Sequence, residues 1–273
     1  LAQRLEIFGR FGQAVARHRL QVCLSEKYMS SRKTALVTGA AARIGAEVSK
    51  TLHRRGCDVL IHYNSSESAA LKLVDELNAE RAESAFPAQA DLSSPKGLEQ
   101  LAGEARKHFE RLDILVNNAS RFYPTVMGQT KAWQWDDLLN SNLRGPYFLV
   151  QELLDDLQTA GGNVINIIDI HAERPMPGHA VYCMSKAGLA MMTQALAQEL
   201  GPSIRVNGVS PGAILWPANE PDTQEKQAIL EKVVLERVGS PADIASAVAY
   251  LALDAPYVTG QILAVDGGRS LNV

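Results

Sequence analysis

From Lys33 onward, short runs of apolar residues alternate with longer segments in which apolar residues recur every three or four positions. The short runs are rich in Val, Ile and Leu and are almost continuous, as in strands that are buried on both faces of a parallel sheet. The expected strands lie near residues 35–37, 59–61, 85–86, 114–116, 164–168, 204–209 and 262–265.

The longer segments predict helices between these strands. The clearest helix start is Ser94-Pro95, which combines an N-cap residue with proline at the first helical position. Further helices are expected near residues 44–55, 66–81, 135–157 and 180–200 and on both sides of 239–241. This alternation predicts an α/β fold with a single-domain, Rossmann-like, doubly wound parallel sheet of about seven strands flanked by helices. Ligands of such folds bind at the carboxyl ends of the strands.

Composition narrows the class of protein. The 273 residues, 46% hydrophobic and 21% charged, suit one large domain or at most two small ones. The net charge of −3 gives no electrostatic reason to expect a nucleic-acid or membrane partner, and no apolar run reaches the ~18 residues of a membrane span. Cys23, Cys57 and Cys183 form neither a metal-binding spacing nor a disulfide framework. We therefore expect a cytoplasmic protein without a metal.

The first 28 residues differ from the rest of the chain. They contain several arginines and few acids, so a transit-like amphipathic segment is one alternative. Met29-Ser30-Ser31 looks like a natural start, which favours a segment outside the core. We expect residues 1–28 to be an N-terminal extension and residues 29–273 to form the domain that binds cofactor and substrate.

A turn of small residues, from Thr38 to Gly45, follows the first strand and opens the first helix. Gly39 permits a tight turn, and the helix start at Ile44-Gly45 favours the negative charge of a pyrophosphate. Arg43 stands where glycine is common and adds a cation beside the phosphates, unless it is an ordinary solvated arginine. The order of strand, turn and helix predicts a dinucleotide cofactor, with a plain strand–helix connection as the alternative.

The end of the second strand lacks the acid that would bind the ribose 2′-hydroxyl of NADH. It reads His62, Tyr63, Asn64, Ser65 and Ser66. Without a carboxylate to repel it, a 2′-phosphate can be held by the serine hydroxyls and nearby backbone. We therefore expect NADPH as the cofactor, in contact with this segment.

Two further strand ends carry polar side chains. Asp91-Leu92 follows the third strand and can contact an adenine edge or cap the next helix, and both alternatives stay open. Asn117, Asn118 and Ala119 end the fourth strand. Asparagine amides at this place can brace adjacent strand ends and the cofactor wall, although two asparagines also suit an ordinary turn.

Tyr182 and Lys186 are four residues apart, so they share one face of a helix. An ammonium and a cationic nicotinamide near a phenol would lower its pKa from the ordinary value of about 10, which is too high for proton exchange near neutrality. Asp169 ends the preceding strand. Asn142 could place a water against Lys186 for a proton relay, or could be a polar residue that kinks its helix.

With these motifs, the chain from about Lys33 to its end resembles the short-chain dehydrogenase/reductase family. The resemblance also covers Pro211-Gly212 and Asp266-Gly267-Gly268. It implies hydride transfer from a nicotinamide, with Tyr182 as the acid and Lys186 binding the ribose. It also implies that Asn142 belongs to the relay and that Pro211-Gly212 lies beside the cofactor.

Most of the family has serine where this chain has Asp169, and the difference has a physical consequence. An ionised carboxylate repels the oxyanion that develops when a carbonyl is reduced. It suits a substrate with N–H donors, or a ring nitrogen that gains a proton as a C=N bond is reduced. Phe122 could stack on such a flat ring, with a core aromatic as the alternative.

Three unusual residues, Arg43, Phe122 and Asp169, occur together, and in this the chain resembles the pteridine reductases. The resemblance implies that a pterin lies between Phe122 and the nicotinamide. The residues implied to hold it are Arg43, Ser120, Phe122, Asp169 and Tyr182. In the best-known members, a basic residue contacts the 2′-phosphate at the position of Ser65. Because this chain lacks that basic residue, the resemblance does not fix how strongly NADPH is preferred over NADH.

The leading hypothesis is therefore an NADPH-dependent reductase that takes dihydropterins or dihydrofolate-like substrates to the tetrahydro level. One alternative is a carbonyl or 3-oxoacyl thioester reductase of the same family, and another is a non-catalytic NADPH-binding sensor. The resemblance also implies a homotetramer, through the helices near 135–157 and 180–200. The loop at 213–217 is expected to cover the substrate, and its residues have no assigned roles.

Overall fold

The structure is a computed structural model that describes residues 32–214 and 223–271. The predicted extension at 1–28 lies outside these ranges, as do residues 215–217 of the loop expected over the substrate. The described residues from Lys33 onward belong to one compact unit.

Seven parallel strands form one sheet in the order β3-β2-β1-β4-β5-β6-β7. The strands are β1 (Thr34–Val37), β2 (Asp58–Tyr63), β3 (Ala85–Gln89), β4 (Ile114–Asn117), β5 (Asn163–Ile167), β6 (Arg205–Pro211) and β7 (Ile262–Val265). The strand order reverses between β1 and β4, and ligands of doubly wound folds bind at such a switch point. The predicted fold class and the predicted strands are confirmed.

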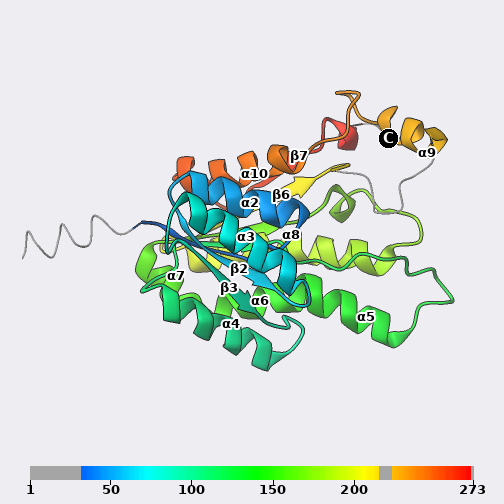
Figure 1. Ribbon diagram of the computed structural model, residues 1–273. Coiled ribbons are helices and arrows are strands. Elements are labelled where there is room, and N and C mark those ends of the chain that lie inside the picture. The colour runs from blue at the N-terminus through cyan, green and yellow to red at the C-terminus, as the bar shows by residue number, and fades with distance from the viewer. Residues whose placement is uncertain (1–31, 215–222, 272–273) are drawn as a thin grey trace, which may run out of the picture. The chain divides into compact units, whose positions relative to one another are not determined.

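Helices cover both faces of the sheet (Figure 1). On one face lie α2 (Arg43–Arg54), α3 (Glu67–Glu80) and α10 (Pro241–Ala249). On the other lie α4 (Pro95–His108), α6 (Gly145–Glu152), α7 (Leu154–Ala160) and α8 (Ala180–Leu200). Two more helices are α5 (Ala132–Leu139) and α9 (Thr223–Leu230). Within the described part of the chain, no helix is both long and apolar enough to cross a membrane.

The strands are continuously apolar because helices cover both faces of the sheet. In β1, Ala35 and Val37 pack with α2, whereas Leu36 between them packs into the core on the opposite face. All three side chains are fully buried. Because successive side chains of a strand point to opposite faces, a sheet covered on both sides needs apolar residues at every position.

The helix expected over 135–157 is interrupted in the structure. After α5, residues Asn140–Arg144 form a π-helical turn, and α6 begins at Gly145. Pro146 has no N–H to donate to the Asn142 carbonyl one turn earlier, and its ring crowds that carbonyl. The prediction of a single helix was therefore wrong at this point. Such π turns are frequent at functional sites.

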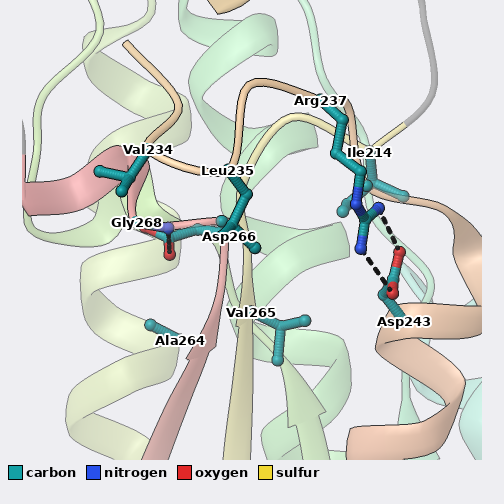
Figure 2. Close-up of a pocket in the computed structure, with 11 residues that line it drawn as sticks. Ile214, Val234, Leu235, Arg237, Asp243, Ala264, Val265, Asp266 and Gly268 are labelled. Atoms are coloured by element: carbon teal, nitrogen blue, oxygen red, sulfur yellow. Dashed lines mark hydrogen bonds and ion pairs between the residues drawn. The ribbon is translucent and has the colours of Figure 1, made fainter.

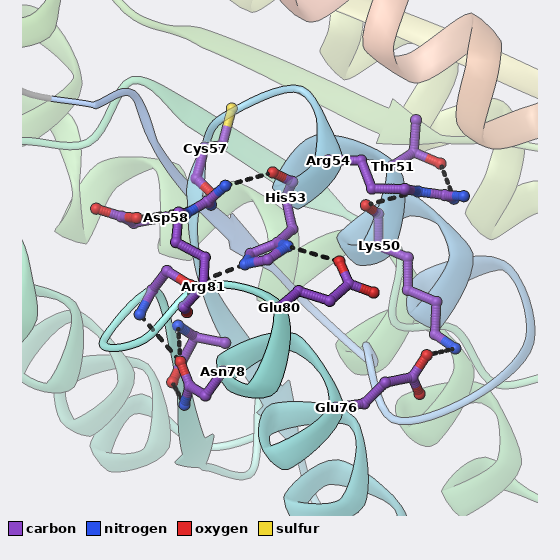
Figure 3. A network of polar contacts seen from close by, with 12 residues as sticks. Lys50, Thr51, His53, Arg54, Cys57, Asp58, Glu76, Asn78, Glu80 and Arg81 are labelled. Carbon is purple, nitrogen blue, oxygen red and sulfur yellow. Dashed lines mark hydrogen bonds and ion pairs between the residues drawn. The ribbon is translucent and has the colours of Figure 1, made fainter.

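A polar network ties the segments at the amino ends of the strands together (Figure 3). Arg81 follows α3 and donates hydrogen bonds to the carbonyl oxygens of His53, at 2.9 Å, and Cys57. The buried His53 ring contacts Ser84 Oγ at 2.8 Å. Asp58 lies in the same network at the start of β2, far along the strand from the end where ligands are expected.

Replacing Arg81 by methionine should destabilise the fold, because two buried carbonyl groups would lose a charged donor. The expected loss of unfolding free energy is about 1–3 kcal/mol, measured by urea unfolding. The matched control is Arg54→Met on α2, where the exposed guanidinium binds Glu47 and Thr51. That variant should lose less than about 0.5 kcal/mol. Equal losses in the two variants would contradict this account of Arg81.

Candidate active site

The turn between β1 and α2 is held by close backbone contacts. Gly39 adopts a left-handed φ of +60°, and a Cβ there would lie 2.9 Å from Ala119 Cα. A Cβ on Gly45 would lie 2.4 Å from the Gly39 carbonyl oxygen and 2.5 Å from Asn118 Nδ2. Both positions therefore require glycine.

Asn118 braces this turn from the end of β4. Its Nδ2 donates to the carbonyl oxygens of Thr38, at 2.8 Å, and Gly39, at 3.0 Å. In return, Thr38 Oγ1 accepts hydrogen bonds from the backbone N–H groups of Asn118 and Ala119. The bracing of adjacent strand ends predicted for the asparagines is therefore present. Asn117 contributes a second link, from its Nδ2 to Asn166 Oδ1 at 2.9 Å.

His62 holds the same turn from the β2 side. Its Nδ1 accepts a hydrogen bond from Gly39 N at 3.1 Å, and its Nε2 lies 3.2 Å from the Ala90 carbonyl oxygen. These partners assign the proton to Nε2. Burial lowers the pKa of His62 to about 4, so the ring is neutral near pH 7. The sequence analysis predicted that His62 contacts the cofactor, and that stays a prediction. The structure shows that His62 positions the backbone of the turn.

The N-terminus of α2 opens beside this turn. Its N-cap residue, Ala42, offers no side-chain oxygen to the first N–H groups, and the first helical turn, Arg43–Ala46, contains no acid. The first backbone N–H groups and the helix dipole therefore favour an anion. Arg43 begins the helix with a left-handed φ of +53° and an exposed side chain.

A cleft of about 390 Å³ lies over the turn and the neighbouring strand ends. It brings together residues that the sequence predicted from the ends of β1, β2, β3 and β4. The lining residues are Gly39, Ala42, Arg43, Ile44, Gly45, His62, Asn64, Asp91, Leu92, Ser93, Asn118, Ala119, Ser120, Arg121 and Ser141. The sequence analysis missed Ser93, Arg121 and Ser141, although each is within two residues of a predicted site residue.

Other residues predicted to bind the cofactor are not among those that line this cleft. Tyr63 is buried in the core at the end of β2. Ser65 and Ser66 are exposed just beyond Asn64, before α3. Pro211 ends β6, and Gly212 N donates to the Val265 carbonyl oxygen at 3.1 Å.

Asp91 shapes the turn that leads to α4. Its carboxylate accepts hydrogen bonds from Ser93 Oγ at 2.7 Å and Ser93 N at 2.9 Å. These hydrogen bonds hold the pKa of Asp91 below its ordinary value. The helix cap itself is Ser94, whose Oγ accepts from Gly97 N at 3.0 Å. The cap was thus correctly predicted at Ser94, and Asp91 lines the cleft while closing the preceding turn.

The candidate catalytic groups meet where β5 ends. Tyr182 Oη, on α8, donates a hydrogen bond to Asp169 Oδ2 at 2.7 Å. The other carboxylate oxygen of Asp169 accepts from His171 N at 2.8 Å, which fixes the orientation of the carboxylate. Tyr182 is buried and Asp169 is half-buried.

The electrostatics of this group favour a neutral phenol. Burial, and then the charge of Asp169, raise the pKa of Tyr182 above its ordinary value. Lys186 Nζ donates to the Ile167 carbonyl oxygen at 2.9 Å and lies 5.9 Å from the Tyr182 ring centroid. Burial lowers the pKa of Lys186 to about 8, against the opposing effect of Asp169. The sequence predicted control of the phenol pKa by Lys186, whereas in this structure burial and Asp169 dominate.

Asn142 lies in the π-helical turn and is fully buried. Its Nδ2 donates to Ser185 Oγ and to the Arg121 carbonyl oxygen, both at 3.0 Å. Its Oδ1 accepts from Arg121 N at 2.8 Å and from Ser120 Oγ at 3.2 Å. Asn142 thus joins the segment after β4 to α8, one residue before Lys186. The predicted relay through a water stays a prediction.

Phe122 is 54% exposed beside these groups, so the alternative of a core aromatic is wrong. Its ring stacks on His179, with centroids 4.8 Å apart and planes 10° apart. The Tyr182 ring packs against it edge-on, also at 4.8 Å. The partly exposed Phe122 ring therefore packs against the ring of the candidate catalytic tyrosine.

A second cavity, of about 360 Å³, lies at the ends of β6 and β7 (Figure 2). Val234 and Leu235 line it with apolar groups, and Arg237 pairs with Asp243 at 3.2 Å. Ile214, from the loop expected over the substrate, also lines it. In the part of the chain that the structure describes, no group of three or more His, Cys, Asp or Glu side chains could hold a metal ion.

Comparisons with known proteins show the family to which the chain belongs. Residues 39–270 match the family model described as enoyl-(acyl carrier protein) reductase. The 3-oxoacyl-acyl-carrier-protein reductase of Staphylococcus epidermidis is 35% identical over 86% of this chain and 98% of its own length. Pteridine reductase 1 of Leishmania tarentolae is 34% identical over 87% of this chain and 96% of its own length.

A similar solved structure is that of a blue fluorescent protein from a metagenomic library, in complex with NADPH. It is 36% identical to this chain, with a TM-score of 0.82, and the match covers 87% of this chain and 97% of that one.

Replacing His62 by asparagine should remove an acid sensitivity of the fold. The unfolded chain takes up a proton at the ordinary histidine pKa of about 6.5, whereas folded His62 does so near 4. Wild-type stability is therefore complete above pH 6.5 and should fall by about 1.4 kcal/mol per pH unit as the pH drops toward 4. Asparagine keeps an acceptor for Gly39 N and cannot titrate. Urea unfolding between pH 7 and pH 5 should show a shallower loss in the variant, and identical slopes would refute the assignment.

Proposed function

The chain belongs to the short-chain dehydrogenase/reductase family of oxidoreductases, and on this premise we propose that it is an NADPH-dependent pteridine reductase. It would reduce dihydropterins, of the dihydrobiopterin or dihydromonapterin kind, or dihydrofolate, to their tetrahydro forms. The observation that carries the proposal is the carboxylate of Asp169, 2.7 Å from the Tyr182 hydroxyl, where most of the family has serine.

The residues around the cleft fit NADPH. The glycine turn and the uncapped α2 N-terminus would hold the pyrophosphate, with Arg43 as an added cation. The exposed Ser65 and Ser66 hydroxyls would hold the 2′-phosphate, and residues 62–66 include no acid that would repel it. NADPH, when bound, supplies the hydride. A relative of similar fold, 36% identical, binds NADPH.

Asp169 and Tyr182 suit a nitrogen heterocycle better than a ketone. The neutral Tyr182 phenol can give its proton to a ring nitrogen as a C=N bond is reduced. Asp169 can then accept hydrogen bonds from N–H groups on the edge of the substrate, which would stabilise its charge. A ketone offers no such donor, and the carboxylate would oppose its developing oxyanion.

Phe122 supplies the complementary contact. Its exposed ring stands beside Tyr182, where a flat pterin could stack between it and the nicotinamide. Ser120 and Arg43, both lining the cleft, would bind the polar edge of the substrate or the adjacent phosphate.

The second candidate is a 3-oxoacyl thioester reductase. It is favoured by the 35% identity to the S. epidermidis enzyme of that name, which is similar to the 34% identity to the pteridine reductase. On this alternative Asp169 would be a hindrance to catalysis, so the two candidates differ in their dependence on this residue.

We also propose a homotetramer built on the α5–α7 and α8 segments. Large apolar side chains are exposed along them, as an interface between copies would require. They are Trp133, Trp135, Tyr147, Met184 and Met191.

The substrate can be tested by following NADPH oxidation with dihydrobiopterin, dihydromonapterin, dihydrofolate, simple ketones and a 3-oxoacyl thioester. We expect turnover of the pterins, and a loss of about 10- to 100-fold in kcat/KM for Asp169→Ser, since a charge-assisted hydrogen bond contributes about 1.5–3 kcal/mol. Activity on ketones or thioesters alone, retained or increased in Asp169→Ser, would support the second candidate instead.

The cofactor preference can be tested with Ser65→Asp. A carboxylate at this position should repel the 2′-phosphate and raise the KM for NADPH by about tenfold or more, while the KM for NADH falls. Ser68→Asp, exposed one turn further along α3, adds the same charge and should leave both constants unchanged. A parallel change in the two variants would mean that the 2′-phosphate does not bind beside Ser65.

A further inference from the structure

We propose that Asp137, on α5, is a positioning residue that fixes Phe122 in the orientation needed to stack on a flat substrate. This inference rests on the proposed pterin reduction. Asp137 does not line the cleft among the described residues, and it would act on the substrate through the segment that carries Phe122.

The two oxygens of the Asp137 carboxylate bind the two chain neighbours of Phe122. Oδ1 forms an ion pair with the Arg121 guanidinium. Oδ2 accepts a hydrogen bond from Tyr123 Oη at 2.9 Å, and the same hydroxyl lies 3.2 Å from the Gln134 carbonyl oxygen. Both neighbours of Phe122 are therefore held by one carboxylate.

The backbone of the same segment is held from the next turn of the helix. Asn142 binds both the N–H and the carbonyl of Arg121, at 2.8 and 3.0 Å. Asp137 and Asn142 belong to the continuous helical stretch of α5 and the π turn. This stretch thus restrains the residues on each side of Phe122 through the Arg121 and Tyr123 side chains and through the two peptide groups that flank Arg121.

Phe122 needs such restraint because it is not embedded in the core. It is 54% exposed, and its described ring contacts are with His179 and Tyr182. The Asp137 side chain is 20% exposed and its partner Arg121 is 42% exposed, so solvent weakens the ion pair more than the part-buried hydrogen bond from Tyr123. The orientation of an exposed ring then depends on how firmly its neighbours are fixed.

The consequence for binding can be estimated. An aromatic stack contributes about 0.5–1.5 kcal/mol beyond the burial of its area, which corresponds to a two- to tenfold change in affinity. Losing the restraint should therefore weaken substrate binding by up to about tenfold without altering the proton and hydride chemistry.

The test compares Asp137→Ala, Asp137→Asn and Tyr123→Phe with the wild type. Hydrogen exchange of the peptide containing residues 120–123, followed by mass spectrometry, reports the restraint without any substrate. It should accelerate most in Asp137→Ala and less in the other two, which keep part of the hydrogen bonding. Asp136→Ala, the adjacent exposed acid on α5, should leave it unchanged.

Kinetics then separate positioning from a structural role. In Asp137→Ala, the KM for a dihydropterin should rise about three- to tenfold, while kcat stays the same. Adding Asp137→Ala to Phe122→Leu should cause no further rise, because the stacking ring is already gone. If Asp137→Ala does not fold, Tyr123→Phe carries the same test with a smaller effect.

Unchanged exchange of residues 120–123, or a KM effect that persists in the Phe122→Leu background, would overturn the inference. A wild-type enzyme that fails to reduce any dihydropterin would instead overturn the proposed function. In that case the exchange measurement still shows whether Asp137 restrains the segment, so the two failures are distinguishable.

Discussion

At the carboxyl ends of parallel strands, backbone N–H and carbonyl groups run out of strand partners while they are still shielded from water. Such groups must be paired by something else. In this protein polar side chains provide the pairing: Asn118 for the Thr38 and Gly39 carbonyls, His62 for the Gly39 N–H, and Lys186 for the Ile167 carbonyl. These contacts fix the edge of the sheet on which the cofactor and substrate are proposed to bind. The site is thus built from the same groups that complete the hydrogen bonding of the sheet.

The three ionisable groups at the end of β5 depend on this arrangement. Burial disfavours charge on both Tyr182 and Lys186, while Asp169 supports the ammonium and opposes a tyrosinate. The protein alone therefore holds a neutral phenol next to a carboxylate. A substrate that brings N–H donors to Asp169 would delocalise and screen its negative charge, and so weaken one of the two effects that keep the phenol from ionising. Substrate binding and proton release from Tyr182 would then be coupled through one carboxylate.

The sequence allowed most of the fold to be predicted, because the relevant signals are local. Continuous apolar runs such as 114–116 mark strands covered on both faces, and Ser94-Pro95 marks a helix start. The π turn at Asn140–Arg144 has a weaker signal, a single proline in an otherwise regular helical pattern. The proline indicates that the helix is interrupted near this point, but it does not indicate that the interruption is a π-helical turn.

The site was predictable to the extent that its residues follow strand ends. The hydrogen bond between Asp169 and Tyr182 joins residues that the topology brings to one edge, so their proximity could be expected. The roles of His62 and Asp137 could not, since each depends on a partner about 14 to 28 residues away that no spacing rule connects. The controlling effect of burial on the pKa of Tyr182 also required the packed structure.

At Arg43, the backbone conformation and the proposed binding of an anionic cofactor favour different residues. A residue with a side chain adopts its left-handed backbone conformation at a cost of about 1 kcal/mol, which glycine would avoid. Selection for thermal stability alone would therefore tend to remove the arginine, and selection for binding an anionic cofactor would tend to keep it. The identity of this one residue in related chains would record which of the two pressures prevailed in each lineage.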